Sequence, residues 1–230
     1  MKTEKKFGKT IDTVIFDMDG VLIDSEPLWH IAAVEIFKQY GINLTAEQYA
    51  TTTGLRTKEF VEYWFEYFSI PTAETPKAID DLLALVIDLV KEKGKIMPGI
   101  PAIFDFFAQK GFKIGLATSS PHSLIEVVVA KAGINHYLQV KASAEDLPYG
   151  KPHPDVYLQC AALLGSHPTQ CICFEDSFNG MLAAKSARMK CVVIPAPNQL
   201  KDVKWGAADL KLSSLQNFGN LHLENLIAQP

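Results

Sequence analysis

The stretch IDTVIFDMDGVLIDSEPLW, residues 11–29, decides how the rest of the chain is interpreted. Its run TVIF, from Thr13, is typical of a buried strand, yet two carboxylates, Asp17 and Asp19, follow it directly. Charged side chains at the mouth of a core strand cost free energy to desolvate unless something pairs with them, and no basic residue lies nearby in the sequence. The pair is therefore either exposed to solvent in a turn, or holds a cation and takes part in chemistry.

The composition is that of an ordinary globular protein, with 48% apolar and 21% charged residues in a chain of 230. This length suits one large domain, or one domain that carries an insert. The net charge of −4 argues against a broad nucleic-acid-binding face, whereas a local positive site can still attract a small anionic substrate.

The sequence predicts neither a membrane protein nor a secreted one. No apolar run approaches the roughly 18–20 residues of a membrane span, and the charged start MKTEKKFGKT lacks the apolar region of a signal peptide. The four cysteines, Cys160, Cys171, Cys173 and Cys191, match no zinc-binding spacing and are interpreted as buried free thiols. We expect a cytoplasmic monomer with no nucleic-acid partner and no membrane contact.

Short apolar runs alternate with stretches of helical periodicity along most of the chain. The runs are TVIF from Thr13, KIGLAT from Lys113, YLQVKA from Tyr137, CICF from Cys171 and CVVI from Cys191, with DLKLSS from Asp209 as a last short candidate. Helical periodicity lies between them, at 100–109, 123–132, 154–164 and 180–187. This alternation predicts an α/β fold with a Rossmann-like parallel sheet that helices cover on both faces.

One long segment breaks the alternation. From about 26 to 95 the sequence shows only helical patterns, at 29–40, 58–68 and 76–93. Because this is too long for one crossover, we predict an α-helical domain (26–95) inserted into an α/β core (1–25 and 96–230). KGKIMPGI, from Lys93, is the expected return hinge, since Pro98 and Gly99 punctuate it.

Ligands of open parallel sheets bind beyond the carboxyl ends of the strands, near the point where strand order reverses. The residues that follow the predicted strands are mostly polar. They are Asp17, Asp19 and Gly20 after the first strand, Thr118, Ser119 and Ser120 after the second, Lys151 in the loop after the third, and Glu175, Asp176 and Ser177 after the fourth. Carboxylates, hydroxyls and one ammonium group should therefore meet at one edge of the sheet, a set that suits phosphoryl transfer.

This set predicts a Mg²⁺ site, because Mg²⁺ takes a few carboxylate oxygens and keeps several waters. We expect the side chains of Asp17 and Asp176 to be metal ligands, and Asp19 to add its backbone carbonyl. Thr118 and Lys151 would then hold the phosphate oxygens.

Neighbouring residues have supporting roles. The backbone N–H of Ser119 is a candidate phosphate donor, and Ser120 is assigned to capping the helix that begins near Pro121. Ser177 is expected to cap the helix after Asp176. Glu175 either contacts the metal through water or accepts a hydrogen bond from a backbone amide, and the sequence favours neither.

Four motifs carry a resemblance to a known family. DMDGVLIDS, ATSS, GKPHPD and FEDSFNG resemble, in order and spacing, the motifs of the haloacid dehalogenase superfamily. The helical insert lies where the β-phosphoglucomutase-like branch places its helical cap, and the resemblance covers essentially the whole chain. ASAEDLPYGKPHPDVYLQCAALLG and FEDSFNGMLAAKSARMKCVVIPAP are further similar to bacterial hexitol-phosphate and 2-deoxyglucose-6-phosphate phosphatases.

The resemblance implies roles for the two acids of the first motif. Asp17 would be the nucleophile that forms an aspartyl-phosphate, and Asp19 the general acid for the leaving alkoxide and then the base that activates water. Gly20 would allow the backbone to turn sharply after them. Mg²⁺ is the implied cofactor, and a small phosphorylated metabolite the implied partner.

Four residues are candidates for specificity within the cap. Ser25, Glu26 and Arg56 could contact sugar hydroxyls, although Arg56 could equally be a solvated charge. Trp29 starts the cap just beyond the hinge IDSEPLW, from which a side chain could face the phosphate site.

These observations together predict a Mg²⁺-dependent phosphatase of small phosphorylated sugars or sugar alcohols, with hexitol phosphates or 2-deoxyglucose 6-phosphate favoured. β-Phosphoglucomutase is one alternative, but the mutases carry a histidine where this chain has Trp29, and their cap arginine matches TGLRTKE only with an offset. The other alternative is a non-catalytic phospho-sugar-binding protein. Against it, the acids, the lysine and the threonine of all four motifs are intact.

Overall fold

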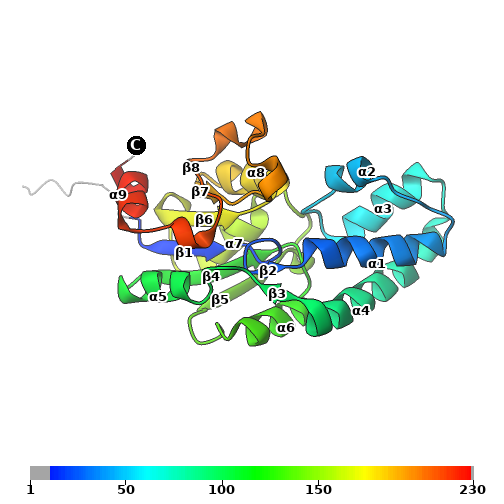
Figure 1. Cartoon of the computed structure of the whole chain (residues 1–230), viewed down its shortest axis with the longest axis horizontal. Coiled ribbons are helices and arrows are strands. Elements are labelled where there is room, and N and C mark those ends of the chain that lie inside the picture. Colours follow the sequence, from blue (N-terminus) through cyan, green and yellow to red (C-terminus); the bar gives the residue numbers. More distant parts are fainter. Residues whose placement is uncertain (1–10, 229–230) are drawn as a thin grey trace, which may run out of the picture.

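The computed structural model describes residues 11–228, and it contains a six-stranded parallel sheet in the order β5-β4-β1-β6-β7-β8 (Figure 1). The strands are β1 (Thr13–Phe16), β4 (Lys113–Thr118), β5 (Val140–Ser143), β6 (Cys171–Glu175), β7 (Lys190–Val193) and β8 (Leu210–Lys211). All six are expected from the sequence. Among the described residues, no helix has the length and apolarity needed to cross a membrane.

The strand β5 begins three residues later than the run YLQVKA suggests. The backbone N–H groups of Tyr137 and Leu138 donate to the carbonyls of Ile134 and Asn135, at 3.0 and 3.3 Å. These residues therefore form a turn after the preceding helix, and their backbone is not available to the sheet.

Helices cover both faces of the sheet, as the alternation predicts. They are α5 (Ala102–Gln109), α6 (His122–Ala132), α7 (Asp155–Leu163), α8 (Phe178–Ser186) and α9 (Asn220–Ala228). Short 3₁₀ turns lie at Thr72–Glu74, Ala144–Asp146, Pro168–Gln170, Pro197–Gln199, Val203–Ala207 and Leu215–Asn217. One buried cluster joins one face of the sheet to α5, α6 and α9, and a second joins the other face to α7 and α8.

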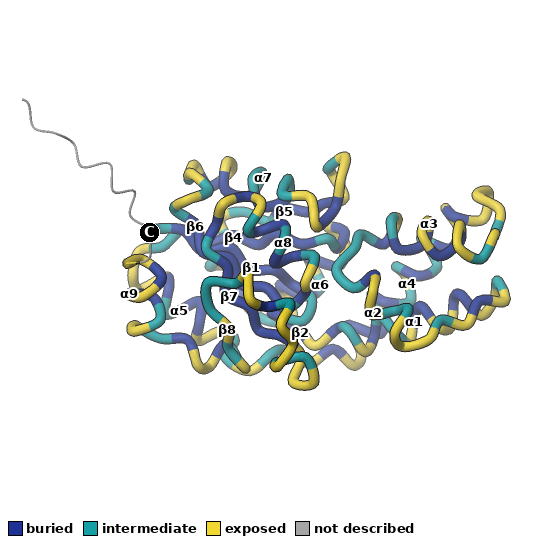
Figure 2. The backbone as a smooth tube through the Cα atoms, turned by 90° about the horizontal axis from the view of Figure 1, so that it is seen from above, coloured by how far each residue is buried: buried dark blue, intermediate teal, exposed yellow. Residues whose placement is uncertain are grey.

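Alternation along β1 explains why two clusters form. Val14 and Phe16 point to the α5 side and Ile15 to the α7 side, and all are fully buried. Figure 2 shows the sheet as the dark blue centre of the molecule. The four cysteines are free and buried, as expected.

The segment after β1 leaves the sheet and forms a helical body beside it (Figure 1). Its helices are α1 (Glu26–Lys38), α2 (Ala46–Thr51), α3 (Thr57–Tyr67) and α4 (Thr75–Lys93). Its interior is aromatic, with Phe37 stacked on Phe60 at a centroid distance of 5.2 Å. The short helix α2 is absent from the sequence prediction because none of its residues is buried, so it shows no apolar periodicity.

Two short antiparallel strands join this helical segment to the core. They are β2 (Ile23–Asp24) and β3 (Lys95–Ile96), which pair Ile23 with Ile96 and Asp24 with Lys95. The sequence gives no strand signal here, because a two-residue strand is too short to show alternation. The division of the chain into domains at 25/26 and 95/96 stays a prediction.

We expect Phe16→Ala to lower the free energy of unfolding by about 3–5 kcal/mol, because it opens a cavity in a packed aromatic group. Phe16 stacks between Phe104 and Phe174, at centroid distances of 4.6 and 4.9 Å. Urea denaturation measures the change, with Val203→Ala, at a side chain 96% exposed, as the control that changes stability by under about 0.5 kcal/mol. A loss below about 1 kcal/mol in Phe16→Ala would contradict this packing.

Candidate active site

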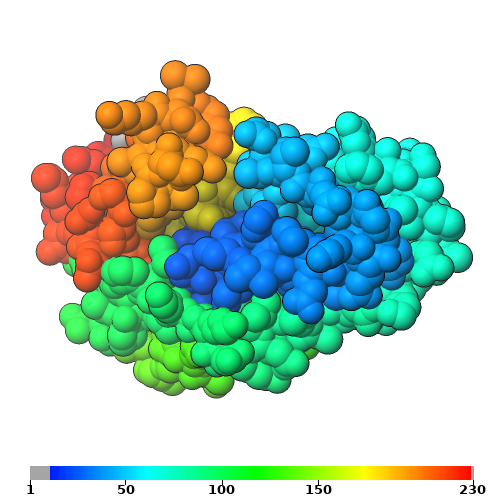
Figure 3. Space-filling view, turned by 45° about the vertical axis from the view of Figure 1, so that its right-hand side comes forward, coloured from blue at the N-terminus to red at the C-terminus, as the bar shows by residue number. Residues whose placement is uncertain are grey.

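The site lies at the carboxyl end of β1, the strand at which the strand order reverses. From β1 the sheet extends through β4 and β5 on one side and through β6 and β7 on the other. The loops that follow β1, β4, β5 and β6 therefore meet. Asp17, Thr118, Lys151 and Asp176 line a single cavity there, together with residues of α1, α2 and α3. The helical segment, blue to cyan in Figure 3, packs against the core and contributes residues to the cavity wall.

Lys151 is the central positive charge of this cavity. Its side chain is 1% exposed, and its Nζ lies 2.8 Å from Asp17 Oδ1 and 2.6 Å from Glu175 Oε1. Because β1 and β6 pair Phe16 with Phe174, the next residues, Asp17 and Glu175, are neighbours across the sheet. Burial acts to lower the pKa of Lys151, but these carboxylates raise it above its ordinary value. The lysine is therefore held as an ammonium ion.

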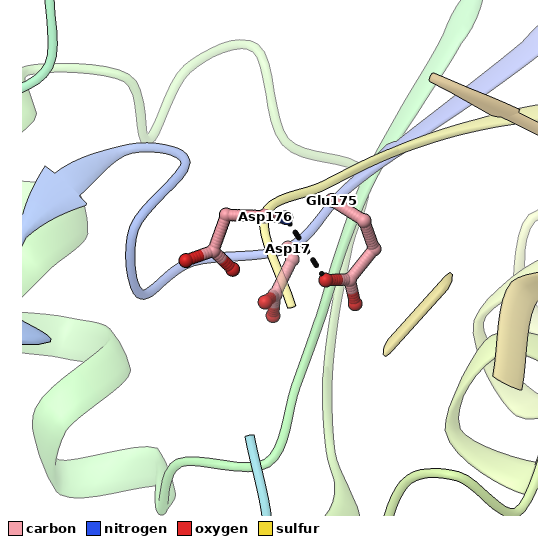
Figure 4. Close-up of side chains that lie close together, drawn as sticks. All are labelled: Asp17, Glu175 and Asp176. Atoms are coloured by element: carbon pink, nitrogen blue, oxygen red, sulfur yellow. Dashed lines mark hydrogen bonds between the residues drawn. The ribbon is translucent and has the colours of Figure 1, made fainter. Parts of the chain in front are cut away.

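Glu175 is fixed by five donors. Its Oε1 accepts hydrogen bonds from Lys151 and from the Tyr157 hydroxyl at 2.6 and 2.5 Å. Its Oε2 accepts from the backbone N–H groups of Asp176 and Ser177 at 3.1 and 3.2 Å, and from the Ser177 hydroxyl at 3.2 Å. Figure 4 marks the bond from Asp176. Of the two roles left open by the sequence, the amide acceptor is therefore present.

Three carboxylates crowd together beside Lys151. Asp17, Glu175 and Asp176 each offer an oxygen, and these oxygens lie within 4.8 Å of one another (Figure 4). Burial, and then the neighbouring Glu175, raise the pKa of Asp17 to about 7 although Lys151 opposes them. Burial and neighbouring carboxylates also raise the pKa of Asp176 well above its ordinary value. The donor set and its excess negative charge suit a divalent cation with oxygen ligands.

Gly20 is required by the approach of Asp176. Its φ is +72°, and a Cβ built there would lie 1.8 Å from Asp176 Oδ2. The sequence predicts a sharp turn at Gly20, which the positive φ bears out. The close approach of the two motifs is an additional reason for glycine, and it concerns a residue far away in the sequence.

Asp19 faces the cavity and accepts three side-chain hydrogen bonds. Ser25 Oγ and Trp29 Nε1 donate to its Oδ1 at 2.5 and 3.1 Å, and Ser120 Oγ donates to its Oδ2 at 2.6 Å. The side chain of Ser25 is fully buried against Asp19 and is not among those that line the cavity, so its contact with sugar stays a prediction. The capping role for Ser120 is wrong, since the residue before α6 is Pro121 and the Ser120 hydroxyl donates to Asp19 instead.

The hydroxyls after β4 lie in the cavity wall. Thr118 is buried, and its Oγ1 accepts a hydrogen bond from the Ser120 N–H at 3.1 Å. Ser119 lines the same cavity, and its hydroxyl donates to the Gly54 carbonyl at 2.8 Å. Ser177 caps α8 by accepting from the Gly180 N–H, as expected. The phosphate contacts of Thr118 and Ser119 stay predictions.

The cap candidates Glu26 and Trp29 line the cavity, as do Tyr49 and Phe60 of the helical segment. Burial, followed by the charge of Asp19, raises the pKa of Glu26 to about 8. The helical segment therefore contributes one carboxyl group and several aromatic rings to the cavity wall.

Arg56 is not among the residues that line this cavity, and its side chain is not solvated. Its contact with sugar stays a prediction. Its side chain is 14% exposed and donates to backbone carbonyls of Ala144, Leu147 and Pro148 in the core. It also pairs with Glu59 at 2.6 Å. The guanidinium group is attracted to a cluster of carbonyl oxygens that the sequence does not reveal.

A family model described as a haloacid dehalogenase-like hydrolase matches residues 11–188. The chain belongs to the haloacid dehalogenase-like hydrolases. This confirms the resemblance carried by the four motifs, and it makes the chain an enzyme of the hydrolase class. Hydrolases of this family generally use a divalent metal, for which the carboxylate cluster offers ligands.

Relatives of known name agree with this family. Hexitol phosphatase B of Escherichia coli K12 is 39% identical over 208 residues, which cover 90% of this chain and 94% of the relative. A phosphorylated carbohydrates phosphatase of Thermotoga maritima is 30% identical over 180 residues, covering 77% and 82%. A crystal structure of β-phosphoglucomutase from Clostridium difficile matches with a TM-score of 0.84 at 23% identity, covering 95% and 97%, and it shows the shared fold.

Sequence reasoning missed three residues that hold the site together. Tyr157 lies on α7 and donates to Glu175, Ser120 donates to Asp19, and Glu59 accepts from the Gly150 N–H at 3.0 Å. Ser120 carries a signal, since it follows the threonine and serine of ATSS. Tyr157 and Glu59 carry none, because their partners are distant in sequence.

We expect Glu26→Gln to raise the free energy of unfolding without metal by about 4 kcal/mol at pH 8, and to leave it unchanged near pH 4. Glu26 has an ordinary pKa of 4.5, which folding raises to about 8. Between these values the unfolded state ionises while the folded state keeps its proton, so stability falls as pH rises. Urea denaturation at several pH values measures this, with the exposed Glu35 of α1 changed to Gln as control. Equal effects of both variants at every pH would contradict the raised pKa of Glu26.

We expect Mg²⁺ to raise the melting temperature of the wild type but not that of Asp176→Asn. The amide keeps the shape of Asp176 and removes a carboxyl that burial and its neighbours keep from ionising. The variant without metal should therefore melt no lower than the wild type. Thermal denaturation in EDTA and in Mg²⁺ measures both effects, and an equal Mg²⁺-induced rise in variant and wild type would refute this cation site.

Proposed function

We propose that this enzyme is a Mg²⁺-dependent phosphatase of small phosphorylated sugars or sugar alcohols. The observation that carries the proposal is the placement of Lys151 Nζ at 2.8 Å from Asp17 Oδ1, with Asp19 and Asp176 facing the same cavity. The named phosphatases among the relatives support it, since both act on phosphorylated carbohydrates or polyols by name.

In the proposed reaction Asp17 is the nucleophile. A carboxylate oxygen attacks phosphorus, the bond from phosphorus to the sugar oxygen breaks, and an aspartyl-phosphate forms. The ammonium group of Lys151 favours the ionised form of Asp17 that this attack needs, and it would attract the phosphate oxygens as well. Thr118 and Ser119 line the same cavity and are the proposed phosphate donors.

Asp19 is the proposed general acid and base. It would donate a proton to the sugar oxygen as that oxygen leaves, and then take a proton from the water that attacks the aspartyl-phosphate. Ser25, Trp29 and Ser120 fix its carboxyl group from three directions, so that it is held within the cavity. Such fixed placement is what proton transfer requires.

Mg²⁺, when bound, would neutralise charge on the transferring phosphoryl group. Asp17 and Asp176 are the proposed side-chain ligands, and Asp19 is proposed to add its backbone carbonyl. The raised pKa values of Asp17 and Asp176 support this role, because two carboxyls so placed ionise more readily beside a cation.

The helical segment is the proposed cap, with the core at 1–25 and 96–230 and the cap at 26–95. Glu26 and Trp29 would face the sugar, and hexitol phosphates or 2-deoxyglucose 6-phosphate are the favoured substrates. We propose a cytoplasmic monomer, and four reduced, buried cysteines agree with a reducing compartment.

Asp17→Asn should lower kcat by at least about a thousandfold, because the amide is not a nucleophile. Release of inorganic phosphate from a hexitol phosphate and from p-nitrophenyl phosphate measures kcat, with and without EDTA. Asp80→Asn, an exposed position on α4, is the matched control and should keep wild-type turnover. Wild-type activity in Asp17→Asn would end the proposal.

The identity of the product separates hydrolysis from the mutase alternative. With β-glucose 1-phosphate as substrate, the proposed phosphatase yields glucose and inorganic phosphate. Accumulation of glucose 6-phosphate would instead assign the chain to the mutases. If no phosphorylated metabolite is turned over, the chain would be assigned as a non-catalytic binding protein.

A further inference from the structure

The segment that leads into α3 contacts the core at three places. The Thr53 carbonyl accepts a hydrogen bond from Asn179 Nδ2 at 3.0 Å, and the Gly54 carbonyl accepts one from Ser119 Oγ at 2.8 Å. Arg56 contacts the loop that follows β5. The loop after β4, the loop after β5 and the first turn of α8 are thus each tied to the helical segment at one place.

The contact of Arg56 is the most extensive of the three. Its Nη1 donates to the carbonyls of Ala144 and Leu147 at 3.1 and 2.6 Å, and its Nη2 donates to the carbonyl of Pro148 at 3.0 Å. The fixed fork of a guanidinium group suits several acceptors at once. No other described side chain donates a hydrogen bond to these three carbonyls.

Glu59, in the first turn of α3, completes the contact that Arg56 makes from the position before this helix. Its Oε1 lies 2.6 Å from Arg56 Nη2 and accepts from the Gly150 N–H at 3.0 Å. Burial acts to raise the pKa of Glu59, but the bonds from Arg56 and Gly150 lower it below its ordinary value, so the carboxylate is ionised. We call these two residues the Arg56–Glu59 clasp.

The clasp packs against the backbone directly before Lys151. A Cβ at Gly150 would lie 2.5 Å from Glu59 Oε2 and 2.8 Å from Arg56 Cγ, so only glycine allows this approach. Lys151 follows at once and reaches Asp17 and Glu175. A chain of contacts therefore runs from α3 through Gly150 to the charged centre of the site.

We infer that Arg56 and Glu59 are positioning residues, which hold the loop 144–150 so that Lys151 is in place when the helical segment is docked on the core. This inference rests on the proposed function for its catalytic consequence. This positioning role differs from a role in substrate specificity, since the clasp contacts the protein's own backbone and lies outside the cavity.

Two substrates distinguish positioning from contact with the sugar. In Arg56→Ala, kcat should fall by the same factor, on the order of tenfold, for a hexitol phosphate and for p-nitrophenyl phosphate, because both need Lys151. Guanidinium ion at millimolar concentration should restore part of the loss. A loss confined to the hexitol phosphate would show that Arg56 serves the sugar, and unchanged kcat for both would likewise overturn the inference.

Lys58→Ala is the matched control. Lys58 lies on the same helix and pairs with Glu62 at 3.8 Å, with both side chains largely exposed. It should keep wild-type kcat for both substrates. If Arg56→Ala does not fold, Arg56→Lys decides, because it keeps the charge but cannot reach the three carbonyls and Glu59 together. Wild-type kcat in Arg56→Lys would then count against positioning.

Amide hydrogen exchange tests the clasp without any activity. Exchange across 144–150 should be faster in Arg56→Ala and in Arg56→Lys than in the wild type, and unchanged in Lys58→Ala. Unaltered exchange in the Arg56 variants would overturn the clasp. If exchange is faster in the Arg56 variants but the wild type has no phosphatase activity, the proposed function alone is overturned.

Discussion

The site is organised by one buried ammonium group among acids. Lys151 contacts Asp17 and Glu175, and Asp176 adds a third carboxylate close by. Burial makes each unpaired charge costly, so the lysine and the acids fix one another in place. The parallel register of β1 and β6 sets the first two acids side by side. One positive charge does not balance three acids, and a cation or a change of protonation must make up the difference.

The core alone does not complete this cavity. Asp19 is held partly by Ser120 of the core and partly by Ser25 and Trp29, which lie where the helical segment begins. That segment also lines the cavity, through Glu26 and its aromatic neighbours. The lysine and the acids around it therefore come from the core, and the side chains that would contact a sugar come from the helical segment. The two sets meet at the first turn of α1.

Much of this arrangement can be predicted from the sequence, because the strands are apolar runs and each ends in polar residues. That pattern predicts the six strands and the order of the motifs. It also predicts that four side chains meet at one cavity, those of Asp17, Thr118, Lys151 and Asp176. What escapes prediction depends on contacts between distant segments. Arg56 is an example, since its acceptors are backbone carbonyls that have no signature in the sequence.

The paired strands β2 and β3 have a consequence for how such a protein changes over time. Asp24 and Lys95 are paired across the two strands, so the chain leaves the core and returns to it at the same place. An insertion with adjoining ends imposes no strain on its host when its length or sequence drifts. Evolution can therefore remodel the helical part for new molecules while the sheet and its acids stay as they are.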